Sequence, residues 1–180
     1  DLKFPHHECE IAQSKGSGKP DPAKYWMHTN MLTMNGAKMS KSVGNVVSID
    51  ELRTGDHPLL EKGFSEMVIR FFMLQSHYSS TLDLSSSAIS ASEKGFEKLM
   101  NAMETLSSLN TSDSSSINVE ELKNKCEEAM MDDFNTPILI ANLFEGVKII
   151  NSVKSEKETV TDSDLTLLKE LLNSYVFDVL

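Results

Sequence analysis

Residues 31–45, MLTMNGAKMSKSVGN, contain the signals that decide the fold of the first part of this chain. Asn35 and Gly36 lie between two short apolar runs. Both residue types tolerate a positive φ, so the pair predicts a type I′ turn that joins two antiparallel strands. The second strand is expected to end near Lys38. A small sheet should therefore lead directly into the segment 38–42, KMSKS.

The segment 38–42 has a composition suited to binding phosphate. Lys38 and Lys41 lie three residues apart among hydroxyl side chains, and a glycine follows at position 44. A lysine ammonium is a compact charge on a flexible stem, so this loop can bring positive charge to a phosphate chain. Lys and Ser alone would equally describe a solvated surface loop. The full string, placed after a hairpin and before a helix, resembles the KMSKS signature of class I aminoacyl-tRNA synthetases.

After this loop the sequence predicts one helix after another. Ser48 and Glu51 have the spacing of a capping box, and apolar residues recur at helical intervals near 65–77 and 85–109. A polar stretch at 110–116 predicts a mobile linker. Three further helices are expected to start at Asn118 with Glu121, at Thr136 as N-cap with Pro137 at N1, and at Thr161 with Asp164. The expected fold is mainly α with a small α/β portion, followed by an α-helical bundle.

The charge distribution limits the ways in which the chain can bind nucleic acid. The 180 residues contain 17 Lys and Arg against 27 Asp and Glu, a formal charge of −10. Residues 1–100 hold 11 basic and 12 acidic side chains, whereas residues 101–180 hold 6 and 15. This balance excludes binding through a bulk positive field, so any contact with a polyanion must be local.

The cysteines and the hydropathy pattern bear on the compartment. Cys9 and Cys126 lie far apart in the chain and form no disulfide framework, which favours a reducing cytosol. Cys126 falls on the apolar face of a predicted helix and is expected in the core. No run approaches the roughly 18 consecutive apolar residues of a membrane span. A cytoplasmic protein without membrane contact is expected.

A second candidate site lies in the segment 4–14, FPHHECEIAQS. His6 and Glu10 are four residues apart, so on a helix they share one face, as two ligands of one metal ion would. Imidazole and carboxylate both suit zinc. A solvated helix start is the alternative, because four ligands are needed and no second pair is visible. His7 is read as structural, and His28 as an ordinary polar position.

Taken together, these segments resemble cysteinyl-tRNA synthetases. The similarity rests on residues 4–14, on YWMH at 25–28, on KMSKS with the following VGN, and on DDFNTP at 132–137. It covers essentially the whole chain. The resemblance implies that L-cysteine and ATP react to give cysteinyl-adenylate and pyrophosphate, after which tRNA(Cys) takes the cysteinyl group. The first part of the chain would then be the end of a class I Rossmann-type catalytic domain.

The same resemblance implies roles for the loop residues. Lys41 is expected to be the main contact to the leaving phosphates, and Lys38 to help order the loop. The hydroxyls of Ser40 and Ser42 would be secondary donors, and Met39 would anchor the loop in an apolar slot. Mg²⁺ would accompany ATP. Positioning of the reactants and stabilisation of the developing charge should account for most of the rate acceleration of adenylate formation.

The resemblance also implies a zinc ion. In the family, two cysteines from earlier in the chain bind zinc together with the histidine and glutamate that match His6 and Glu10. The zinc binds the substrate thiolate, which separates cysteine from serine because a soft sulfur ligand prefers zinc far more than a hydroxyl does. The other two ligands would lie outside this sequence.

Departures from the family pattern are also present. Cys9 stands where the family commonly has Asn, and Met131 replaces a frequent acidic residue. No His-Ile-Gly-His motif is found. The chain is therefore expected to be an internal or C-terminal fragment, inactive alone, of a monomeric parent enzyme. Its expected parts are 1–47 with the zinc-ligand helix and KMSKS loop, 48–110 as a stem-contact region, and 111–180 as the bundle of the tRNA-binding region.

Two other functions remain open from the sequence. A related ligase could join activated cysteine to the amine of an amino sugar instead of to tRNA. A non-catalytic helical interaction module descended from a synthetase is the other alternative, although such a module has no need of an intact KMSKS loop.

Overall fold

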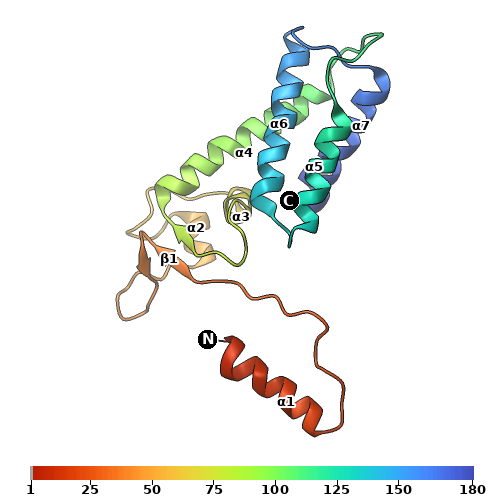
Figure 1. The fold of residues 1–180 in the computed structure, drawn as a ribbon. Coiled ribbons are helices and arrows are strands. Elements are labelled where there is room, and N and C mark those ends of the chain that lie inside the picture. Colours follow the sequence, from red (N-terminus) through yellow and green to blue (C-terminus); the bar gives the residue numbers. More distant parts are fainter. Residues whose placement is uncertain (1) are drawn as a thin grey trace.

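The computed structural model describes residues 2–180, which pass from a small α/β part into a helical bundle (Figure 1). In chain order the elements are the π-helical segment η1 (Leu2–His7), α1 (Glu8–Gly16), β1 (Leu32–Met34), β2 (Ala37–Lys38), α2 (Ile49–Thr54), α3 (Glu66–Leu74), β3 (Leu82–Leu84), α4 (Ser86–Leu106), α5 (Val119–Met131), α6 (Thr136–Lys154), α7 (Asp162–Asn173) and the π-helical segment η2 (Ser174–Val179). The expected class, mainly α with a small α/β portion, is confirmed.

The sheet has three strands with β1 in the centre, antiparallel to β2 and parallel to β3. Asn35 and Gly36 have φ values of 51° and 76°, as the predicted type I′ turn requires. Thr33 pairs with Lys38 across this hairpin and with Asp83 on the other side. The hairpin is confirmed, and it places Lys38 on the edge strand at the start of the KMSKS segment.

A first hydrophobic cluster joins the sheet to α2, α3 and the beginning of α4. The predicted capping box starts α2: Glu51 N–H donates to Ser48 Oγ at 3.2 Å, and Ser48 N–H donates to the Glu51 carboxylate at 2.7 Å. Burial of one large apolar side chain contributes about 1.5–3 kcal/mol. The cluster therefore holds the chain after the loop firmly on the sheet. Its buried members are Met34, Val47, Leu52, Phe64, Val68, Ile69, Phe72, Leu84 and Ile89.

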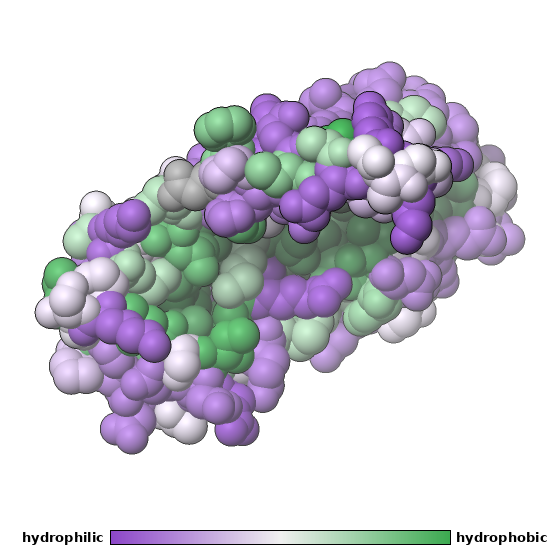
Figure 2. Space-filling model, turned by 90° about the horizontal axis from the view of Figure 1, so that it is seen from below, coloured by the Kyte–Doolittle hydropathy of each residue, from purple (hydrophilic) through white to green (hydrophobic). Residues whose placement is uncertain are grey.

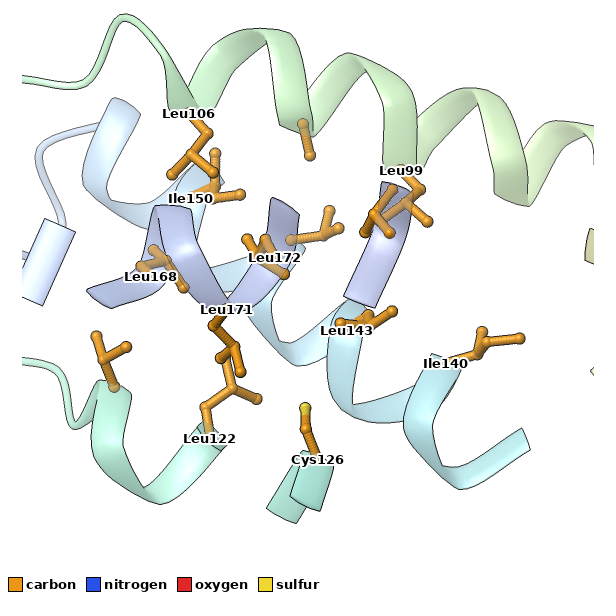
Figure 3. Packing of buried hydrophobic residues seen from close by; sticks show 14 of the residues in the cluster. Leu99, Leu106, Leu122, Cys126, Ile140, Leu143, Ile150, Leu168, Leu171 and Leu172 are labelled. Atoms are coloured by element: carbon orange, nitrogen blue, oxygen red, sulfur yellow. The ribbon is translucent and has the colours of Figure 1, made fainter. Parts of the chain in front are cut away.

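The second cluster is the core of the bundle, formed by α5, α6, α7 and the C-terminal half of α4 (Figure 3). Leu143, Leu168, Leu172 and Cys126 are fully buried there, so the predicted core position of Cys126 is confirmed. Gly146 allows close packing, because a Cβ atom at this position would lie 3.2 Å from Leu172 Cδ2. The bundle thus contains its own apolar partners for each helix.

Helix α4 belongs to both clusters. Ile89 lies in the first cluster, whereas Leu99, Ala102 and Leu106 lie in the second. The division between the two cores therefore lies within α4.

The polar stretch 110–116 is more ordered than its composition predicts, because its backbone is hydrogen-bonded to the segment before α7. Ser112 N–H donates to the Val160 carbonyl at 2.8 Å, and Ser116 N–H donates to the Thr159 carbonyl at 3.0 Å. The three expected parts of the chain remain a prediction.

The start of α6 differs from the expected one. Asn135, not Thr136, is the N-cap, since Ile138 N–H donates to Asn135 Oδ1. Asp133 and Phe134 both adopt positive φ values, 53° and 55°. These two residues turn the chain out of α5 so that Asn135 faces the first free N–H groups of α6, and Asn is a stronger N-cap than Thr. The predicted caps at Asn118 and Thr161 are confirmed.

The N-terminal elements differ from the rest of the molecule. Helix α1 has no buried residue and lies apart from the other helices at the end of an extended segment (Figure 1). No helix among residues 2–180 is long and apolar enough to cross a membrane.

Candidate functional site

The KMSKS segment forms an exposed loop between β2 and α2. Val43 and Gly44 each donate their N–H to the Ser40 carbonyl at 3.2 Å, which closes a tight turn. Gly44 has a φ of 74°, a conformation that side chains rarely adopt. Lys38 and Lys41 are both exposed, and no salt bridge within residues 2–180 involves either of them. The two ammonium groups are therefore available to a ligand.

The remaining loop side chains have distinct surroundings. Met39 is half-buried and packs against the first hydrophobic cluster. The hydroxyls of Ser40 and Ser42 lie 3.1 Å apart and share a hydrogen bond. The loop thus combines one apolar contact with a surface of hydroxyls and lysines, which is a surface able to bind phosphate oxygens.

Asn45 joins the two ends of this loop, a role that the sequence analysis missed. Its side chain is 7% exposed. Ser40 N–H donates to Asn45 Oδ1 at 2.8 Å, and Asn45 Nδ2 donates to the Lys38 carbonyl at 3.1 Å. The only sequence signal is that Asn directly after a loop glycine often bonds nearby backbone groups. Asn45 therefore sets the shape of the loop while the lysines remain free.

A carboxylate on β3 holds the hairpin that leads into the loop. Asp83 accepts hydrogen bonds from Thr33 Oγ1 at 2.6 Å and from Gly36 N–H at 2.7 Å. These two hydrogen bonds hold the pKa of the Asp83 carboxyl below its ordinary value, and the bond from Thr33 has the larger effect. Asp83 thus holds the hairpin that leads into the loop, and Asn45 holds the loop itself.

The candidate metal ligands lie on the N-terminal elements. His6 belongs to η1 and Glu10 to α1, and both are exposed. No group of three or more His, Cys, Asp and Glu that could hold a metal ion occurs within residues 2–180. The two residues offer the nitrogen and oxygen donors that zinc accepts, but they form at most half of a four-ligand site.

Structure brings together two histidines that the sequence analysis treated separately. The Nδ1 atom of His7 lies 2.8 Å from the Nε2 atom of His28, within hydrogen-bond distance. The Trp26 ring lies beside both, with ring centroids 4.6 Å from His7 and 6.4 Å from His28. An open cleft of about 570 Å³ borders this group and includes Met27 and Met31. This contact ties the extended segment before β1 to η1, which carries His6 and leads into α1.

An apolar cleft of about 500 Å³ lies between β1 and the corner that joins α5 to α6. Leu32, Leu74, Leu82 and Phe134 line it. Seen from below, the molecule has apolar side chains gathered in hollows between polar rims (Figure 2). The structure thus leaves an accessible apolar surface close to the strand that precedes the KMSKS loop.

Residues 1–94 match the family model described as the tRNA synthetases class I (C) catalytic domain, and residues 125–179 match the DALR domain. The chain is 49% identical over 180 residues to the cysteine–tRNA ligase of Bacteroides fragilis and 51% identical over 182 residues to that of Bacteroides thetaiotaomicron. Both alignments cover 100% of this chain. The chain spans 37% of the length of each relative.

A solved structure with a similar fold is the ternary complex of Agrobacterium radiobacter K84 LeuRS with tRNA and LeuAMS. The TM-score is 0.64 with 19% sequence identity, over 96% of this chain and 24% of that chain. At this identity the similarity concerns the fold alone.

Proposed function

The chain belongs to the class I tRNA synthetase family whose catalytic-domain model matches residues 1–94, and on this premise we propose that it serves the ATP-dependent ligation of L-cysteine to tRNA(Cys). Relatives about half identical to it are named cysteine–tRNA ligases, which supports cysteine as the amino acid. Because the chain spans 37% of their length, we assign it part of the site: the phosphate-binding loop and two metal ligands.

The loop acts in the first step, the attack of the cysteine carboxylate on the α-phosphorus of ATP. The bond between the α- and β-phosphates breaks, and negative charge grows on the leaving pyrophosphate together with its Mg²⁺. Lys41 stabilises this charge and Lys38 supports the loop, while the hydroxyls of Ser40 and Ser42 donate further hydrogen bonds. Donors that are already in position need little reorganisation in the transition state. The observation that carries the proposal is that Lys38 and Lys41 are exposed and form no salt bridge with residues 2–180, on a loop that Asn45 holds in shape.

His6 and Glu10 would hold a zinc ion together with two ligands outside this chain. When bound, zinc supplies a soft Lewis acid that prefers a thiolate to a hydroxyl. This chain contributes one imidazole and one carboxylate, which lie on neighbouring turns of η1 and α1. The hydrogen-bonded pair of His7 and His28 then keeps this helix start next to the segment that leads to the loop.

The second step transfers the cysteinyl group to the 3′-terminal ribose hydroxyl of tRNA(Cys). The match of residues 125–179 to the DALR domain supports a role of the bundle on the tRNA side. The bundle is acidic, so we expect it to position the tRNA through shape and local contacts instead of through a positive field. We expect the parent protein to work as a monomer in the cytoplasm, without membrane contact.

The loop assignment is tested by Lys41→Ala in the full-length ligase that carries this chain. Cysteine-dependent ATP–pyrophosphate exchange should fall by about 10²–10³-fold, the usual effect of removing one donor to a developing charge. Lys98→Ala, at an exposed position of α4, is the matched control and should leave exchange unchanged. Exchange at the wild-type rate in Lys41→Ala would refute the assignment.

The metal assignment has a readout that does not depend on activity. Zinc content, measured by elemental analysis of the purified ligase, should fall from one ion per chain to almost none after His6→Ala together with Glu10→Ala. Glu8→Ala, exposed on the same helix, should retain the metal. Stoichiometric zinc in the double variant would contradict the ligand assignment.

A further inference from the structure

The corner between α5 and α6 has an unusual backbone. Asp133 and Phe134 are consecutive residues with φ values of 53° and 55°, and neither is glycine. Such left-handed residues cost conformational free energy and persist only where their surroundings hold them. Phe134 is 53% exposed and lines the apolar cleft, so burial alone does not hold this conformation.

Backbone bonds within the corner, from Phe134 N–H to the Met130 carbonyl at 3.2 Å and from Asn135 N–H to the Ala129 carbonyl at 3.0 Å, are supplemented by contacts from the first part of the chain. In the turn between α3 and β3, the Tyr78 hydroxyl lies 2.8 Å and 2.9 Å from the two carboxylate oxygens of Asp133 and donates to them. The Asp133 carbonyl accepts from His77 Nε2 at 3.1 Å. Ser79 Oγ, 2.7 Å from His77 Nδ1, fixes the orientation of that ring. Side chain and backbone of Asp133 are therefore both bound from residues more than 50 positions earlier.

The same turn also holds the strand that leads to the KMSKS loop. Asn30 N–H donates to the Tyr78 carbonyl at 3.3 Å, and Asn30 Nδ2 donates to the Ser79 carbonyl at 3.1 Å. Two residues earlier, His28 makes the contact with His7. The turn 77–79 thus contacts the strand of the candidate site on one side and the corner of the bundle on the other.

We propose that Tyr78 and Asp133 are positioning residues that set the orientation of the helical bundle relative to the KMSKS loop, and that they act on the transfer of cysteine to tRNA and not on adenylate formation. This inference rests on the proposed function. Adenylate formation needs the loop, ATP and cysteine, and within residues 2–180 no hydrogen bond joins the loop 38–42 to the corner. Transfer needs a tRNA whose body is placed by the bundle and whose 3′ end reaches the site, so it depends on the angle between them.

Loss of this contact should leave the fold intact. Helix α4 contributes residues to both hydrophobic clusters. The Arg70 guanidinium on α3 also donates to the carbonyls of Val179 and Leu180 at the end of η2. The two parts therefore stay joined without the Tyr78 hydroxyl, and only their relative orientation loses a constraint.

The test uses Tyr78→Phe, Asp133→Ala and the double variant in the full-length ligase. Cysteine-dependent ATP–pyrophosphate exchange without tRNA should stay within about twofold of wild type. The single-turnover rate constant for transfer to subsaturating tRNA should fall by about tenfold, the value of one charge-assisted hydrogen bond. The double variant should be no worse than Asp133→Ala, because both single variants remove the same contact between Tyr78 and Asp133. Asp113→Ala, in the loop before α5, is the control.

Asp133→Asn is the conservative variant. Its amide oxygen still accepts from Tyr78, and Asn tolerates the left-handed conformation. The rate of transfer in Asp133→Asn should therefore be much closer to wild type than that in Asp133→Ala. Equal losses in exchange and transfer would overturn the inference, as would wild-type transfer in Tyr78→Phe and Asp133→Ala. If the wild-type ligase itself showed no exchange, the proposed function would fail first.

Discussion

Helix α6 and helix α1 show the two extremes of packing in this molecule. Eight residues of α6 are buried, among them Leu139, Leu143 and Ile150, which are fully inaccessible. Helix α1 buries none and contains the candidate ligand Glu10. Amphipathic helices with partners in the same chain derive their stability from that packing. The contrast shows that the bundle is held by a large apolar core within this chain, whereas the candidate site is built on exposed segments with few apolar contacts.

Exposure suits the residues of the site. Lys41, Lys38 and Glu10 can reach a ligand only because they are not engaged by a core. Segments with few apolar contacts also open at low free energy, which is typical of ligand-binding loops. Stability and proposed chemistry are thus separated along the chain, and four experiments test that separation.

The largest effect is expected from a cavity in the bundle. Leu143→Ala should lower the free energy of unfolding by about 3–4 kcal/mol, because it removes a fully buried side chain. Ile11→Ala on α1, a helix with no fully buried residue, should cost less than about 1 kcal/mol because this side chain is only half-buried. Urea unfolding followed by circular dichroism measures both. Similar losses for the two variants would show that α1 is packed as firmly as the bundle.

The two cysteines provide a chemical form of the same contrast. Burial, with smaller contributions from Glu145 and Glu127, raises the pKa of the Cys126 thiol to about 11. At pH 8, about three pH units below this pKa, only about one Cys126 thiol in a thousand is ionised. Alkylation requires the thiolate, so the reaction of Cys126 should be slow. Cys9 is exposed. Alkylation followed by mass spectrometry should modify Cys9 at least about a hundredfold faster than Cys126, and denaturant should abolish the difference. Equal rates in the native protein would contradict a closed core.

Asn45→Ala tests how far the loop depends on one side chain. It removes both hydrogen bonds that join the loop ends, which should cost about 1–3 kcal/mol. Hydrogen exchange should become faster at the Ser40 amide but not in α6. Ser42→Ala, which removes only the hydroxyl contact within the loop, is the matched control. Unchanged exchange at Ser40 would show that Asn45 does not hold the loop.

The smallest effect is expected from acid at the hairpin. The folded-state pKa of Asp83 is depressed by its bonds to Thr33 and Gly36, so its contribution to stability is present above the ordinary carboxyl pKa of 3.8 and is lost as the pH falls through the lower folded value. The site is exposed, so the loss should be below about 1 kcal/mol. A pH titration of the Gly36 amide by NMR should show this transition in wild type but not in Asp83→Asn. An unchanged titration in Asp83→Asn would exclude this carboxylate as its source.

Local patterns were predictable from the sequence. The hairpin at Asn35 and Gly36, the capping box of Ser48 with Glu51, the approximate positions of α3 and α4 and the starts of α5 and α7 all depend on neighbours within a few residues. The roles of Lys38 to Ser42 and the metal ligands His6 and Glu10 rest on resemblance, and they remain predictions. The predicted N-cap of α6 was wrong by one residue. The left-handed turn at Asp133 and Phe134 leaves no local sequence signal that favours Asn135 over Thr136 as the N-cap.

The sequence by itself determined which segments are helices, which residues form the turn before the KMSKS loop and which family the chain resembles. These properties follow from backbone preferences and side-chain periodicity, which act over short distances. Only the tertiary structure decided that His28 meets His7 across 21 positions and that Tyr78 meets Asp133 across 55. Contacts of this kind depend on how packed elements bring distant polar groups within 3 Å, and no local pattern contains that information.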